Sequence, residues 1–306
     1  MNDNTLIVDI LEQVFGDVKK HNWDKGQISF DCPVCSYDIK GLSCGDGKGN
    51  LEINYMRGIY KCWACSETHN TKGRMSYIVQ RWGSPQDSKK LNLIIPDEFK
   101  ISGKSNKIKL PQGYVLLSEQ NPNDLSVKQA FNYLHKRNLS DELIKKYKIG
   151  ITFSGEYKNK IIIPSYNREG ELKYFVARSY VSSKMKYKNP DVSKMDLIFN
   201  EEFIDWNENI YLVEGVFDMF FVDNSIPLLG KVLSDYLWSE LYNKSKGLIY
   251  ICLDGDAWDD TIKLYHKLNG GKLLHRIKVI KLPMDKDIAD LKGDIKKYET
   301  EIEYGY

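Results

Sequence analysis

Acidic side chains that follow two apolar runs are the residues of this sequence best suited to metal chemistry. Residues 248–253 (LIYICL) lead into Asp254, a glycine and Asp256, and residues 210–213 (IYLV) lead into Glu214. Functional side chains of an open parallel sheet gather at the carboxyl ends of its strands. If these runs are neighbouring strands, the three carboxylates meet in one small space and repel one another unless a cation is bound. Oxygen ligands favour Mg²⁺ or Mn²⁺, so the pattern predicts a divalent-metal site.

Two further acids are candidate ligands of this site. Asp218 follows Glu214 by one helical turn, and Asp287 follows a third strand-like run in VIKLPMDKDIADL. Asp287 is equally compatible with a metal ligand and with a helix N-cap. The simpler interpretation of Asp254 and Asp256 is that they are ordinary acids near a helix N-terminus. That interpretation explains one acid well and three acids poorly.

Paired cysteines form the most specific local motif. Cys32 and Cys35 form one CxxC knuckle and Cys62 and Cys65 form a second, and β-prone residues lie between them. Two such knuckles supply the four thiolates of a closed tetrahedral Zn²⁺ site, which predicts a zinc ribbon. Cys44 and His69 are competing ligands that the sequence leaves open.

Aromatic and basic residues surround the second knuckle. Arg57, Lys61 and Trp63 could stack on bases and hold phosphates, as exposed aromatic and basic side chains do on single strands. The alternative is that Tyr60 and Trp63 pack the small core of the ribbon. The sequence gives both interpretations about equal weight.

The overall composition is that of a globular protein with more than one domain. The chain has 306 residues, 42% of them hydrophobic and 28% charged, with a net charge of +2. No apolar run approaches the ~20 residues that span a bilayer, and the acidic N-terminus is no signal peptide, so we expect a cytoplasmic protein that is not secreted. Apolar residues from Leu6 to Val18 recur at helical spacing and predict a first helix.

The chain divides into segments of different character. We expect a zinc-binding domain over residues 1–84 and a linker over 85–110, which lacks clear helical or strand periodicity. Strand-like and helix-like segments then alternate, which predicts an α/β (α+β overall) catalytic region with subdomains over 111–205 and 206–306. Basic residues recur between 158 and 194, where they form either a solvated face or a phosphate-binding surface.

Several motifs, taken together, resemble one family. Glu214-Gly with Asp254-Gly-Asp256 resembles the TOPRIM fold of primases, topoisomerases and some nucleases. CPVC, CWAC, FNYLHKRNLSDELIKKYKIGI and KYKNP (186–190) resemble, in order along the chain, the motifs of DnaG-type bacterial and phage primases. The resemblance covers nearly the whole chain outside the linker, and the combination is highly specific.

This resemblance implies a DNA primase, a nucleotidyltransferase that makes short RNA primers on a single-stranded DNA template from ribonucleoside triphosphates during replication. Glu214, Asp254 and Asp256 would organise catalytic Mg²⁺ or Mn²⁺, with support from Asp218. The zinc ribbon would read the template, and a basic groove would hold template and nucleotide through Arg178, Lys186, Lys188 and Asn189.

Departures from the family pattern qualify this expectation. No Walker A motif is present, and the chain stops shortly after the TOPRIM-like segment, which resembles a stand-alone phage-type primase in the host cytoplasm with a separate replicative helicase. The alternative functions are a TOPRIM nuclease or topoisomerase-like enzyme, and a non-catalytic DNA-binding recombination mediator.

Overall fold

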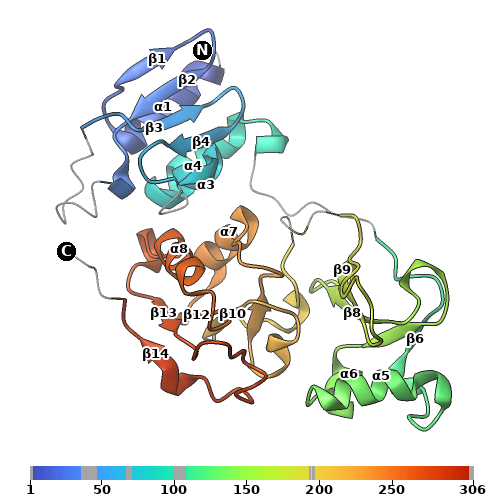
Figure 1. Cartoon of the computed structure of the whole chain (residues 1–306). Helices are drawn as coiled ribbons and strands as arrows, with labels where there is room; N and C mark the ends of the chain where they lie inside the picture. The colour runs from blue at the N-terminus through green and yellow to red at the C-terminus, as the bar shows by residue number, and fades with distance from the viewer. Residues whose placement is uncertain are drawn as a thin grey trace. The chain divides into compact units, whose positions relative to one another are not determined.

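A computed structural model describes residues 3–35, 47–66, 71–99, 108–192, 194 and 197–302 (Figure 1). Its contacts divide the chain into two compact units, and each is described by itself. Unit 1 comprises Met1–Ser102, Leu233–Lys244 and Asp259–Ile277, and unit 2 comprises Gly103–Val232, Ser245–Trp258 and Lys278–Tyr306. Within the part of the chain that is described, no helix is both long and apolar enough to cross a bilayer.

Unit 1 contains a five-stranded antiparallel sheet in the order β1-β2-β3-β4-β5. Burial alternates along the two central strands β3 and β4, so that Leu51 and Ile53 of β3 lie in the core while Glu52 and Asn54 are half-buried. This period of two gives the sheet one core face and one outer face. The strands are β1 (Lys20–Asn22), β2 (Gln27–Phe30), β3 (Leu51–Asn54), β4 (Ile59–Cys62) and β5 (Lys72–Arg74).

Helices complete the core of unit 1. The predicted first helix is confirmed, and its Phe15 ring lies 5.5 Å from Phe30 of β2. Tyr77 stacks on Tyr60 of β4 at 6.0 Å, which packs its own helix against the sheet. The elements are α1 (Asp3–Phe15), α3 (Met75–Trp82), α4 (Pro85–Ile94), α7 (Asp235–Lys244) and α8 (Trp258–Leu268), with short 3₁₀ turns η1 (Asp97–Phe99) and η6 (Gly271–Leu273).

The expectation of an irregular segment over residues 85–110 is wrong for its first part, because α4 occupies Pro85–Ile94. Ser84 and Asp87 form a reciprocal capping box, and Pro85 stands at the first helical position, where its missing N–H costs nothing. Leu91 is buried and anchors the helix. Local capping and one apolar contact therefore make a helix without a clear amphipathic period.

Unit 2 contains two sheets. The first is a four-stranded antiparallel sheet in the order β6-β7-β8-β9, with two helices inserted between β6 and β7. Its elements are β6 (Tyr114–Leu116), η2 (Leu117–Glu119), α5 (Leu125–Lys136), α6 (Asp141–Lys146), β7 (Gly150–Thr152), η3 (Gly155–Tyr157), β8 (Lys160–Tyr166) and β9 (Leu172–Ser179).

The second sheet has five strands in the order β11-β10-β12-β13-β14, and β10 pairs in parallel with both β11 and β12. One hydrophobic cluster, which includes Ile161, Val213 and Cys252, joins it to the first sheet. The mixed α/β class is therefore confirmed. The elements are η4 (Glu201–Phe203), β10 (Ile210–Val213), η5 (Asp218–Phe220), β11 (Ser225–Pro227), β12 (Ile249–Cys252), β13 (Ile277–Ile280), η7 (Lys296–Tyr298) and β14 (Glu299–Thr300).

The compact units do not follow the domain boundaries expected from the sequence. Helices α7 and α8 belong to the predicted 206–306 subdomain, yet they pack with the N-terminal segment in unit 1. The boundaries at 84, 110 and 205 stay a prediction, since compactness in one conformation does not define an independently folding domain.

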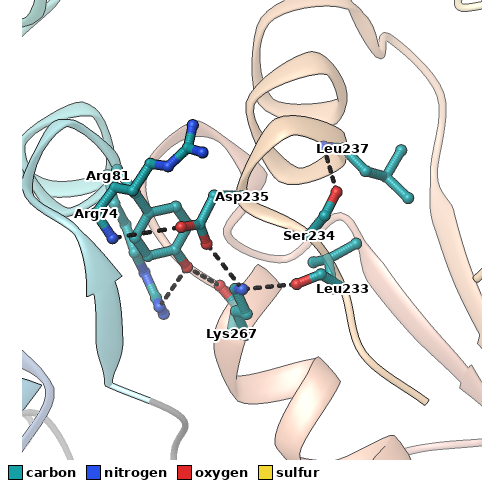
Figure 2. A network of polar contacts seen from close by, with 8 residues as sticks. Arg74, Arg81, Leu233, Ser234, Asp235, Leu237 and Lys267 are labelled. Carbon is teal, nitrogen blue, oxygen red and sulfur yellow. Dashed lines mark hydrogen bonds and ion pairs between the residues drawn. The ribbon is translucent and has the colours of Figure 1, made fainter. Parts of the chain in front are cut away.

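A buried polar network joins α3 to α7 and α8 within unit 1 (Figure 2). The Lys267 ammonium donates to Asp235 Oδ1 at 3.1 Å and to the Leu233 carbonyl at 2.8 Å, and the Arg74 backbone N–H donates to Asp235 Oδ2 at 3.3 Å. Arg81 donates to the His266 carbonyl at 2.6 Å. Lys267 is 3% exposed, and this burial lowers its pKa against the opposing effect of Asp235.

We expect Asp235→Ala to destabilise the protein by about 3–5 kcal/mol, because it leaves a buried ammonium without its counter-ion. Lys267→Met removes the charge and keeps the aliphatic volume, so its cost should be smaller. Chemical denaturation measures both changes.

Lys263→Ala is the matched control, because Lys263 forms a surface ion pair with Asp260 on the same helix α8. It should change stability by no more than about 0.5 kcal/mol. Equal effects of Asp235→Ala and Lys263→Ala would show that the network does not hold unit 1 together.

Candidate metal centres and nucleic-acid surfaces

Four thiols converge in unit 1 at one end of the five-stranded sheet β1–β5, called the ribbon sheet below. Cys32 and Cys35 follow β2, Cys62 ends β4, and the ligand atoms of these three and Cys65 lie within 4.8 Å of one another. Cys32 and Cys65 are 3.8 Å apart, and Cys35 and Cys62 are 3.6 Å apart. Zinc–sulfur bonds of about 2.3 Å in a tetrahedron require sulfur–sulfur separations of about 3.8 Å. The predicted convergence is confirmed, and its geometry fits Zn²⁺.

Hydrogen bonding within the cluster already stabilises one thiolate. The bond with Cys62 raises the pKa of Cys32, while bonds from Cys32 and Cys65 lower the pKa of Cys62. A metal ion would take over this role by binding all four sulfurs as thiolates. Cys44 and His69, the competing ligands, lie outside the described residues.

The ribbon sheet presents an aromatic and a basic side chain on its outer face. Trp63 is 62% exposed, the Lys61 ammonium lies 4.5 Å from the centre of its ring, and its indole N–H donates to Glu52 at 3.5 Å. Tyr60, in contrast, is buried against Tyr77. Arg57 is exposed at the β3–β4 turn. Core packing therefore describes Tyr60, whereas the exposed Trp63 is available for stacking on bases.

The carboxylates predicted to meet in unit 2 do come together. Val213, the last residue of β10, pairs with Cys252, the last residue of β12. Parallel pairing therefore brings Glu214 and Asp254 to the same end of the two strands. Glu214 is one residue past Val213, and Asp254 is two residues past Cys252. Asp256 lies close to Glu214 as well, because the Lys231 ammonium is 3.7 Å from Asp256 Oδ1 and 4.0 Å from Glu214 Oε2.

Burial and electrostatic crowding both act on Asp218 and Asp254, two members of the acidic cluster formed by Glu214, Asp218, Asp254 and Asp256. Burial raises the pKa of Asp254 to about 7, and repulsion from Asp218, Glu214, Asp287 and Asp256 adds to the effect. Burial likewise raises the pKa of Asp218 to about 6, although the Gly215 N–H donates to its Oδ2 at 2.8 Å and opposes the shift. Such a set of oxygen donors fits a hard divalent cation, which relieves the repulsion.

Two neighbouring features shape this edge of the sheet. A Cβ on Gly255 would lie 1.9 Å from the Pro283 carbonyl oxygen, so only glycine lets the turn between Asp254 and Asp256 pack there. Asp287 Oδ1 accepts from the Asp290 N–H at 2.7 Å, and the residues around it form turns. Asp287 thus caps a turn and no α-helix, while remaining close enough to raise the pKa of Asp254.

Unit 2 contains a cluster of two arginines and three aromatic side chains, one of which is Phe217. Arg178 of β9 donates to the hydroxyls of Tyr133 and Tyr187 and lies 5.1 Å from the Phe217 ring centre. Arg137 donates to Tyr133 at 2.9 Å and lies 4.7 Å from the same Phe217 ring. Both arginines therefore contact a residue that lies three positions after Glu214 in the chain.

The KYKNP segment runs beside β9. The Lys188 N–H donates to the Ala177 carbonyl, and Asn189 Oδ1 accepts from the Ala177 N–H at 3.3 Å. The Lys188 ammonium is paired with Glu156 at 2.9 Å, whereas the Lys186 side chain is exposed. Of the residues predicted to form the basic groove, Arg178 contacts Phe217, and Asn189 holds the KYKNP backbone against β9.

Arg137, which contacts Phe217, and Lys231, which contacts two of the acids, were not predicted as site residues. Arg137 belongs to the FNYLHKRNL motif, whose helical spacing of tyrosine and arginine was the available signal. Lys231, which supplies the ammonium beside Glu214 and Asp256, follows a glycine just after β11. The signal for Lys231 was its place beyond the carboxyl end of a parallel strand.

Comparison with curated proteins finds two DNA primases that are similar to this chain. The DNA primase of Mycoplasma genitalium is 24% identical over 307 aligned positions, which cover 76% of this chain and 50% of that protein. The DNA primase of Staphylococcus epidermidis is 24% identical over 261 positions, which cover 68% of this chain and 41% of that protein. This chain is similar to DNA primases. The resemblance predicted from the sequence is confirmed, and the chain spans half or less of the length of these two primases.

Solved primase structures overlap the chain as well. The Aquifex aeolicus primase, with its zinc-binding and RNA polymerase domains, matches 95% of this chain and 82% of that chain at 18% identity and a TM-score of 0.46. A DnaG catalytic core matches 57% of this chain and 72% of that chain at 18% identity and a TM-score of 0.48. No family model matches the sequence.

We expect Cys44→Ser to retain one zinc ion per chain, because the four converging thiols complete a tetrahedral site by themselves. Cys35→Ser is the matched comparison and should lose the metal. Elemental analysis of the purified variants measures the stoichiometry. Loss of zinc from Cys44→Ser would contradict the four-cysteine assignment.

Proposed function

We propose that this protein is a DNA primase, which synthesises short RNA primers on single-stranded DNA from ribonucleoside triphosphates. The observation that carries the proposal is the convergence of Glu214, Asp254 and Asp256 beyond two parallel strands. Arg137 and Arg178 both contact Phe217, three positions after Glu214 in the chain. The four-cysteine cluster and the similarity to curated DNA primases support it.

Each carboxylate has a defined part in the proposed reaction. Glu214, Asp254 and Asp256 would hold Mg²⁺ or Mn²⁺, and Asp218 would fix the turn after Glu214 through its bond to the Gly215 N–H. When bound, divalent ions acidify an attacking hydroxyl and stabilise the departing pyrophosphate. The aspartates are then held ionised, in contrast to the metal-free state in which burial raises the pKa of Asp254.

The basic residues would position template and nucleotide. The guanidinium groups of Arg137 and Arg178 offer forked donors to phosphate oxygens, and their stacking on Phe217 holds them in place. Lys186, Lys188 and Asn189 would extend this surface, although Lys188 must first release Glu156.

The ribbon would contribute template reading. Trp63 presents an exposed ring for base stacking, and Lys61 and Arg57 present charges for phosphates. Zn²⁺ bound by the four cysteines would hold this surface rigid. A separate replicative helicase as partner, and action in the cytoplasm, follow from the proposed role in replication.

The test incubates purified protein with single-stranded DNA, Mg²⁺ and labelled ribonucleotides. We expect short template-dependent RNA, and we expect Asp254→Asn to reduce its synthesis by about a hundredfold or more, because metal ions supply several kcal/mol of transition-state stabilisation. DNA binding by Asp254→Asn, measured by fluorescence anisotropy, should persist.

Asp259→Asn is the matched control, because Asp259 is an exposed acid in the first turn of α8. It should retain wild-type synthesis. DNA cleavage in place of RNA synthesis would identify a nuclease, and DNA binding without any reaction would identify a recombination mediator. Either result would overturn the proposal.

A further inference from the structure

Lys231 places a positive charge at the acidic edge of the parallel sheet. Its ammonium lies 3.7 Å from Asp256 Oδ1 and 4.0 Å from Glu214 Oε2, so that it bridges acids that follow two different strands. The Lys231 side chain is 34% exposed, that of Glu214 21% and that of Asp256 66%, so the contact with Glu214 is partly shielded from water and the contact with Asp256 is exposed. An ammonium in this position offsets part of the repulsion between Glu214 and Asp256.

The backbone before Lys231 directs it to this position. The Leu228 N–H donates to the Val213 carbonyl at 2.9 Å, and the Gly230 N–H donates to the carbonyl of Glu214 itself at 3.3 Å. Leu229 and Gly230 both have positive φ, of 54° and 136°, so the chain turns sharply just before Lys231. Lys194 adds a further anchor by donating to the Leu229 carbonyl. The residue just before Lys231 is therefore hydrogen-bonded to the backbone of Glu214, one of the two acids that the Lys231 side chain contacts.

The contacts of Lys231 are those that a divalent ion would need. A cation that joins Glu214 to Asp256 must approach the same two carboxylates, and two cations so close repel each other. A lysine side chain is flexible and can withdraw, so the repulsion weakens metal binding without preventing it. When the Lys231 ammonium withdraws toward solvent, both carboxylates become available as metal ligands.

We propose that Lys231 is a tethered cation that competes with the divalent metal for Glu214 and Asp256. In the metal-free protein it holds the two acids together, and metal binding displaces it. The inference rests on the proposed function, because it assumes that these acids bind the catalytic metal. Its consequence is a higher metal concentration for half-saturation than the carboxylates alone would give.

Mn²⁺ binding, followed by electron paramagnetic resonance of the free ion, tests the competition without any measurement of activity. The protein is used with its four-cysteine site loaded with zinc. We expect Lys231→Met to lower the apparent Mn²⁺ dissociation constant about three- to tenfold, the range for removing one or two partly exposed charge interactions. Lys231→Arg, which keeps the charge, should resemble the wild type.

Lys297→Met is the matched control, because Lys297 loses the same charge from a surface pair with Asp294. It should leave Mn²⁺ affinity unchanged. If Lys231→Met binds Mn²⁺ with unchanged or weaker affinity while Asp254→Asn loses binding, the competition is overturned and the metal site stands. If Asp254→Asn keeps full Mn²⁺ binding, the metal site of the proposed function fails, and the competition fails with it.

Discussion

Mutual repulsion among carboxylates beyond the ends of two parallel strands is the constraint on which the rest of unit 2 depends. Pairing of β10 with β12 brings Glu214 and Asp254 together, and Gly255 permits the tight turn that adds Asp256. Burial, strengthened by this crowding, raises the pKa of Asp254 to about 7. A fold gains nothing in stability from such an arrangement, because each ionised acid destabilises its neighbours. The proposed divalent cation would account for this arrangement, and the proposed anionic substrates would account for the two arginines that contact Phe217. Lys231 contacts two of the same acids.

A second constraint acts in unit 1, whose small core needs further contacts between the sheet and the helices. The four cysteines close one end of the ribbon sheet, and the stacked rings of Tyr60 and Tyr77 continue from the sheet into α3. Tyr77 contacts Trp238 of α7 at 4.5 Å, and the Asp235–Lys267 pair lies beside it. The ribbon, α3, α7 and α8 therefore share one core. This shared core makes α7 and α8 depend on the N-terminal segment, although they follow strands of the other unit in the sequence.

Features with short-range signals could be predicted from the sequence, and features that need tertiary contacts could not. The CxxC spacing specified the thiol cluster, and the apolar runs before Glu214 and Asp254 specified two strands with acids at their ends. Helix α4 was missed because its capping box and the single buried Leu91 carry no amphipathic period. The pairing of Lys188 with Glu156, and the place of Lys231 between two acids, depend on segments far apart in the chain. The packing of α7 and α8 with α3 was missed for the same reason.

Thermal melting at different pH values, with and without Mg²⁺, tests the central claim that the acids are held together for a divalent cation. A carboxyl whose pKa is raised by folding contributes stability below its unfolded pKa of about 4 and loses it as the pH rises through the folded value, here about 7. Metal-free protein should therefore melt at a lower temperature at about pH 8 than Asp254→Asn does, and Mg²⁺ should raise the wild-type melting temperature at about pH 8 far more than at about pH 5. A Mg²⁺ effect that is equal at both pH values, or that Asp254→Asn retains in full, would contradict the account.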